Sequence, residues 1–184
     1  DPFVFGLGGD EVMPLEGAGV SCEIVPGISS SIAVPECVGI PVTQKNVSTS
    51  FVVVSGHKAP GEPGAADWDN MPRSCSTIVV LMGVKSLPLI CQYLVQSCGW
   101  DSTTPVAVIQ DGTTPKEVVY YGDLESMPEI AATNSVKSPA IIVIGAVTVL
   151  IKPGSVRSLA LREPDTASST STQQVWGKAK PPPR

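Results

Sequence analysis

The sequence contains little of what several common functional sites require. It has a single histidine, His57, and no G-x-S-x-G motif, which argues against a Ser-His-Asp hydrolase. Its five cysteines include no C-x-x-C pair, and with only one histidine to join them we expect no structural zinc site. An odd number of cysteines favours free thiols in a reducing compartment over a disulfide framework.

Long apolar runs and clusters of basic residues are also missing. No apolar stretch approaches the ~20 residues that cross a bilayer, so we expect a soluble protein without a membrane partner. The net charge is −5 and no basic stripe is present, which argues against nucleic-acid binding. We expect a cytoplasmic location, with a plastid as the alternative if the source is a photosynthetic eukaryote.

The hydrophobic pattern predicts an α/β fold. With 184 residues and 42% hydrophobic content, the chain can bury a substantial core. Continuous β-branched runs are typical of strands covered on both faces, as in a mostly parallel sheet between helix layers. We expect strands within 21–25, 51–54, 78–82, 106–109, 117–121 and 140–144. We expect helices within 10–17, which Pro14 shortens or kinks, and within 29–38, 87–98 and 127–132.

Composition changes suggest four parts along the chain. A polar, proline-containing stretch near residue 43 reads as a linker, and beyond residue 152 serine, threonine and proline predominate. The predicted divisions are a remnant of an N-terminal α/β domain at 1–42, a linker at 43–49, a C-terminal α/β domain at 50–152 and a disordered tail at 153–184.

A series of motifs follows in fixed order along the chain. The motifs are Asp1–Gly9 (DPFVFGLGG), Val25–Ser31, Gly39–Thr43, Ser50–His57, Leu81–Val84, Gln110–Thr113 and Ser138–Gly145. This series closely resembles the tetrapyrrole methylase family, and within it the enzymes that methylate uroporphyrinogen III. The resemblance is collinear from Asp1 to about Leu150 and corresponds to about the last two-thirds of such an enzyme. We therefore expect the family's two-domain fold with its first domain truncated, and a mixed, mostly parallel sheet flanked by helices.

The resemblance implies an activity. Family members of this kind use S-adenosylmethionine, bound between two domains, to methylate uroporphyrinogen III to precorrin-2, on the path to sirohaem and cobalamin. It also implies a homodimer. Two alternatives stay open: a later precorrin methylase of the same family, and a noncatalytic fragment. Because the family's first glycine-rich loop would precede Asp1, we expect this chain alone to bind the cofactor weakly or not at all.

The same resemblance assigns site residues position by position, without identifying a catalytic one. It implies that the cofactor contacts are Asp1, Val4, Ser29, Ser30, Met82, Gly112 and Thr113. Plain structural roles compete with these assignments, since a serine at a helix start can simply be a cap and a methionine ending a strand can be core filler.

Basic residues are expected to contact a carboxylate-rich macrocycle. Lys45 stands where the family has a basic residue, and Lys58 and Lys116 are further local candidates. Leu7 replaces a family arginine, which removes a bidentate carboxylate donor. We interpret His57 as a structural residue of a turn.

Overall fold

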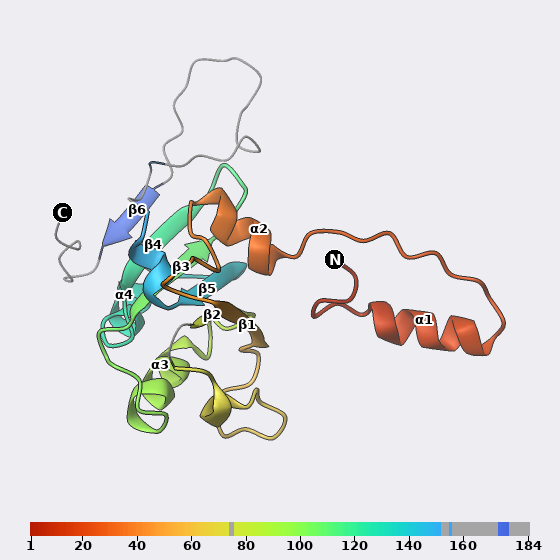
Figure 1. The fold of residues 1–184 in the computed structure, drawn as a ribbon, viewed down its shortest axis with the longest axis horizontal. Coiled ribbons are helices and arrows are strands. Elements are labelled where there is room, and N and C mark those ends of the chain that lie inside the picture. Colours follow the sequence, from red (N-terminus) through yellow and green to blue (C-terminus); the bar gives the residue numbers. More distant parts are fainter. Residues whose placement is uncertain (74–75, 152–154, 156–172, 177–184) are drawn as a thin grey trace, which may run out of the picture.

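A six-stranded sheet forms the centre of the molecule. The computed structural model describes residues 1–73, 76–151, 155 and 173–176. The strand order is β1-β2-β5-β3-β4-β6 (Figure 1). The strands are β1 (Ser50–Ser55), β2 (Ser76–Leu81), β3 (Pro105–Gln110), β4 (Val118–Asp123), β5 (Ala140–Ile144) and β6 (Gln173–Trp176).

The sheet is mixed, as predicted, but it is not mostly parallel. β1 pairs with β2 and β4 with β6 in parallel, whereas the β2–β5, β5–β3 and β3–β4 pairings are antiparallel. The prediction of a mostly parallel sheet is therefore wrong. Continuous apolar runs indicate burial of both faces, which does not depend on strand direction. The short connection between β3 and β4 leaves no room for a crossover helix, so these strands pair as an antiparallel hairpin.

Helices cover both faces of the sheet. On one face lie α3 (Leu87–Gln96) and α4 (Met127–Thr133), and on the other lie α2 (Ser30–Cys37) and the short 3-10 helix η2 (Ala146–Val149) (Figure 1). Successive residues of β2 alternate between the two layers, with Ile78 facing α3 and Val79 facing α2. The sheet is thus the middle layer of a three-layer arrangement.

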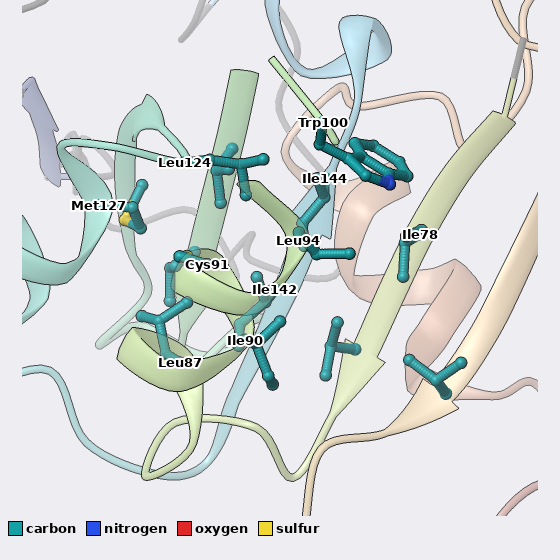
Figure 2. Packing of buried hydrophobic residues seen from close by; sticks show 14 of the residues in the cluster. Ile78, Leu87, Ile90, Cys91, Leu94, Trp100, Leu124, Met127, Ile142 and Ile144 are labelled. Carbon is teal, nitrogen blue, oxygen red and sulfur yellow. The ribbon is translucent and has the colours of Figure 1, made fainter. Parts of the chain in front are cut away.

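The sequence of α3 explains its packing. Leu87, Ile90 and Leu94 recur at helical spacing and are fully buried. Figure 2 shows them directed at the sheet, beside Ile142 and Ile144 of β5. Burying each such side chain stabilises the fold by about 1.5–3 kcal/mol.

The N-terminal residues form an arm that extends away from the sheet (Figure 1). The arm contains α1 (Gly8–Gly17), which includes Pro14 in its second turn, and an extended segment leading to α2. The strand predicted at Ser21–Val25 is not formed, so that prediction is wrong. A strand needs a neighbour to pair its N–H and C=O groups, and this exposed segment has none among the described residues. Most of the exposed large hydrophobic side chains in the described part of the chain lie on this arm.

The predicted tail and the predicted domain limits remain to be compared with the structure. The predicted disordered tail, 153–184, falls mainly on 153–154, 156–172 and 177–184, which lie outside the described residues. Within it, Gln173–Trp176 forms β6, so the prediction is wrong there, because the open edge of β4 offers backbone groups with which a further strand can pair. The predicted domain limits stay a prediction; the proposed linker forms a turn closed by a bridge between Gln44 and Ser48.

Candidate functional site

A cavity of about 710 Å³ opens where central strands of the sheet end. Its walls come from the ends of β2 and β3, the start of β5, the start of α2 and the N-terminal loop. Because β5 is antiparallel to both of its neighbours, its first residues lie at the same edge as their last residues. Pockets for small ligands are commonly about 300–1,000 Å³, so this cavity has a suitable size.

Five of the eight predicted site residues line this single cavity. They come from four separate segments of the chain and are Val4, Ser30, Met82, Gly112 and Thr113. The structure therefore brings together residues that the sequence analysis selected one motif at a time.

Asp1 and Ser29 do not line the cavity but hold the residues that do. The Asp1 carboxylate accepts hydrogen bonds from the backbone N–H groups of Phe3, at 2.8 Å, and Val4, at 3.1 Å. Ser29 is the N-cap of α2, and its Oγ accepts a hydrogen bond from the Ser31 N–H at 3.2 Å. The capping interpretation of Ser29 is thus confirmed.

Lys45 lies away from the cavity. Its loop precedes the first residue of β1, whereas the cavity lies beyond the last residues of β2, which runs parallel to β1. Lys58 and Lys116 are not among the cavity residues either, and the Lys58 ammonium group donates a hydrogen bond to the Pro63 carbonyl. The basic side chains that do line the cavity are His57 and Lys85.

Lys85 had no role in the sequence analysis, and His57 was interpreted as structural. Lys85 lies in a tight turn after β2 in which the Ser86 N–H bonds to the Gly83 carbonyl at 3.1 Å. No local pattern could have identified it, because a lysine in a polar turn is typical of an ordinary surface residue. Both side chains are exposed and therefore accessible to a substrate.

The backbone around the cavity is unusual. Four cavity residues have positive φ without being glycine: Phe5 at 52°, Met82 at 58°, Asp111 at 50° and Thr113 at 67°. Each such conformation costs about 1–3 kcal/mol and persists only where its surroundings impose it. Only two other non-glycine residues in the described part of the chain, Asn46 and Ser135, have positive φ. Backbone strain is therefore concentrated at this cavity, as is common at functional sites.

Met82 is not core filler. Its side chain is 51% exposed, follows the last residue of β2 and belongs to neither buried cluster. The chain beneath it is tightly held, because the Ser86 hydroxyl donates a hydrogen bond to the Gly56 carbonyl at 2.7 Å and the Gly56 N–H bonds to the Leu81 carbonyl at 2.7 Å. The methionine is thus presented to the cavity from a rigid turn.

Gly112 allows the loop after β3 to lie against α2. A Cβ at this position would come within 2.5 Å of Cγ1 of Val34, a buried residue of α2 that also lines the cavity. No larger residue fits unless the helix or the loop moves. The close approach joins two walls of the cavity, one from each side of the proposed linker.

The lining combines an apolar surface with a few polar groups. Val34, Leu81, Ile109 and Ile141 supply aliphatic contacts, and the polar side includes the α2 N-terminus at Ser30. Helix N-termini present backbone N–H groups and positive dipole ends to anionic groups. The arrangement suits a ligand that has both a flat apolar part and charged groups.

Within the described ranges, no group of three or more His, Cys, Asp and Glu residues is arranged to hold a metal ion. None of the helices in that part of the chain is long and apolar enough to cross a membrane.

Comparisons with known proteins identify the family. The family model for tetrapyrrole (corrin/porphyrin) methylases matches residues 1–128. The uroporphyrinogen-III C-methyltransferase of Priestia megaterium is 41% identical over 147 residues, which are 80% of this chain and 61% of that protein. An S-adenosyl-L-methionine-dependent uroporphyrinogen III methyltransferase of Methanosarcina barkeri is 41% identical over 148 residues, covering 80% of this chain and 58% of the relative.

A solved structure agrees with these relatives. The uroporphyrin-III C-methyltransferase of Thermus thermophilus, complexed with S-adenyl homocysteine, superposes with a TM-score of 0.68 at 35% identity. The alignment covers 82% of this chain and 64% of that chain. The present chain spans about three-fifths of the length of the uroporphyrinogen-III C-methyltransferases that it matches. A family model that covers most of the chain, together with these relatives, shows that the chain belongs to the tetrapyrrole methylases.

Proposed function

We propose that this chain acts in the S-adenosylmethionine-dependent C-methylation of uroporphyrinogen III to precorrin-2, a step towards sirohaem and cobalamin. The observation that carries the proposal is the gathering of Val4, Ser30, Met82, Gly112 and Thr113 around one cavity of suitable size. The names of its relatives support the same reaction. The family resemblance also supports a homodimer.

The cavity residues fit the parts of S-adenosylmethionine. Met82 and the aliphatic side chains of Val34 and Ile109 offer an apolar surface for the adenine. Ser30, at the start of α2, offers backbone donors for the carboxylate. When bound, this cofactor supplies an electrophilic methyl group on sulfur. The chain's own contribution is to orient the partners and exclude water, which supplies most of the acceleration in such a transfer.

The basic residues at the cavity suit the tetrapyrrole. Uroporphyrinogen III is rich in carboxylates, and a protein of net charge −5 needs local cations to attract it. His57 and Lys85 line the cavity, so we propose them as carboxylate contacts. A substrate contact by Lys45 stays a prediction. Its loop precedes the first residue of β1, at the end of the strands opposite the cavity.

The proposed binding site can be tested by NMR on the ¹⁵N-labelled full chain, because titration with S-adenosylhomocysteine detects weak as well as tight binding. We expect the backbone amides of Ser30, Met82, Gly112 and Thr113 to shift. The indole N–H of Trp100 should not shift, because this residue lies beside a smaller cavity of about 280 Å³ near the start of β3. Shifts confined to that smaller cavity would contradict the proposal, and the absence of any shift would favour the noncatalytic fragment.

The choice of reaction requires an activity measurement. Transfer of a labelled methyl group from S-adenosylmethionine to uroporphyrinogen III is the expected result. Transfer only to a more highly methylated precorrin would favour a later methylase of the family. Ligand binding without transfer to either acceptor would favour a noncatalytic role.

A further inference from the structure

Glu117 places a buried carboxylate behind the wall of the cavity. It is only 5% exposed and ends the loop that connects β3 to β4. Its Oε2 accepts a hydrogen bond from the backbone N–H of Thr113 at 2.9 Å. Glu117 does not line the cavity, whereas Thr113 does. An effect of Glu117 on a ligand is therefore indirect, and its bond to Thr113 provides a route through the loop.

The loop needs such support because its conformation is unfavourable. Thr113 has a φ of 67°, and a β-branched residue is rarely found in that region. Asp111 in the same loop has a φ of 50°. The bond from Thr113 to a charged acceptor opposes relaxation of the loop, because hydrogen bonds to ionised groups are the stronger kind.

The side chain of Glu117 lies in the protein interior. A buried carboxylate is unfavourable unless hydrogen bonds satisfy it, and the Thr113 N–H donates one such bond to Glu117. Tyr121, which is buried on the α2 side of the sheet, has its pKa raised to about 12 by burial and by the negative charge of Glu117. Glu117 therefore interacts with the buried Tyr121 as well as with Thr113 of the cavity loop.

We propose that Glu117 is a positioning residue, which holds Gly112 and Thr113 in the conformation that forms the wall of the cofactor cavity. The inference rests on the proposed function in that the ligand of this wall is an S-adenosyl compound. It predicts that the carboxylate matters to ligand affinity although it touches no ligand atom.

Three variants of the full chain test the inference. Glu117→Met keeps a side chain of similar length but removes the acceptor, and its apolar character favours folding. Glu117→Gln keeps an acceptor oxygen and should rescue. Asp123→Ala is the matched control, because Asp123 ends β4 at the opposite edge and accepts a hydrogen bond from the Ser126 N–H at 2.8 Å.

The first readout is hydrogen exchange of the Thr113 amide in the ligand-free protein. Glu117→Met should reduce its protection by about tenfold or more, as expected for loss of a hydrogen bond to a charged group, while Glu117→Gln and Asp123→Ala retain most of it. Unchanged protection in Glu117→Met would overturn the inference. This readout is independent of ligand binding.

The second readout is the affinity for S-adenosylhomocysteine from NMR titration. We expect Glu117→Met to weaken binding by about tenfold, since the bond is of that strength, and Asp123→Ala to leave it unchanged. Wild-type affinity in a Glu117→Met protein that has lost Thr113 protection would overturn the link to the cofactor. Failure of the unmodified chain to bind would instead count against the proposed function, while the exchange data would still decide whether Glu117 holds the loop.

Discussion

Gly56 and Gly83 approach each other so closely that a Cβ built on Gly56 would lie 2.6 Å from the Cα of Gly83. The same Cβ would lie 2.7 Å from Cγ1 of Val80, in the buried core. The contact joins the chain that follows β1 to the turn that follows β2. Because Met82 immediately precedes Gly83, this glycine pair sets the position from which the methionine faces the cavity.

Replacing Gly56 with alanine should therefore damage the fold and the cavity together. We expect Gly56→Ala to lower the free energy of unfolding by about 1–3 kcal/mol, because backbone atoms cannot move aside as a flexible side chain would. Thermal unfolding measures this change. Gly17→Ala is the control, since no atom lies within 4 Å of a Cβ at that position. Equal melting temperatures for the two variants would contradict the prediction.

Met82→Asp should reduce ligand affinity far more than stability. The variant loses an apolar contact and adds a charge that the ligand must desolvate, an effect of a few kcal/mol. Its backbone φ of 58° suits aspartate, and its half-exposed side chain allows the carboxylate to stay in water, so we expect stability to change by about 1 kcal/mol or less.

The control for Met82→Asp is Leu89→Asp. Leu89 is 52% exposed on α3 and does not line the cavity. Titration with S-adenosylhomocysteine and thermal unfolding, performed on both variants, separate the two effects. Wild-type affinity in folded Met82→Asp protein would remove this residue from the site.

Gly112 and Val34 should be energetically coupled. Gly112→Ala should destabilise the protein by about 1–3 kcal/mol, because the new methyl group overlaps Cγ1 of Val34. In the Gly112→Ala/Val34→Ala double variant the overlap is relieved, so the combined loss should be smaller than the sum by about 1 kcal/mol or more. Denaturant unfolding of all four proteins gives the coupling, and simple additivity would show that the loop moves aside freely.

Cys91 should make stability depend on pH above 9. Burial, together with the negative charge of Asp123, raises the pKa of the Cys91 thiol from 9.0 to about 12. A raised pKa in the folded state leaves stability unaffected below pH 9 and lowers it as pH rises from 9 to 12, because the unfolded chain loses its proton first. From pH 8 to pH 10 this group should lower the free energy of unfolding by about 1.4 kcal/mol.

The comparison of variants isolates this contribution from those of the tyrosines. Denaturant unfolding of Cys91→Ala should show a smaller decrease between pH 8 and pH 10 than the unmodified chain does. Cys22 is exposed, and Cys22→Ala should behave like the unmodified chain. An identical decrease in Cys91→Ala would show that the thiol does not contribute.

The sequence predicted the strands of the core better than their directions. The runs at Val106–Ile109 and Ala140–Ile144 are unmistakable, because strands buried on both faces leave no polar alternation. Strand direction depends on the connections and on which strands become neighbours. The prediction of a strand at Ser21–Val25 was wrong for a related reason, since strand formation depends on a pairing partner and not on local composition alone.

The candidate site was predictable to the extent that its residues stand in local motifs. Met82 and Gly112 could be selected by their neighbours in the chain, and both line the cavity. Lys85 and Glu117 could not, because a lysine in a polar turn and a glutamate before a strand look like ordinary surface residues. Their positions depend on how β2, β3 and β5 meet, which no short pattern encodes.

The position of β5 also has a consequence for folding. This strand is the last of the five central strands in the chain, yet it lies between β2 and β3 and pairs with both. Until Ala140–Ile144 has been synthesised and inserted, the β1–β2 pair and the β3–β4 hairpin have no strand to join them. Closing these distant contacts is slow, because chain entropy is lost before pairing compensates for it. The cavity edge is therefore complete only after β5 has paired with both β2 and β3.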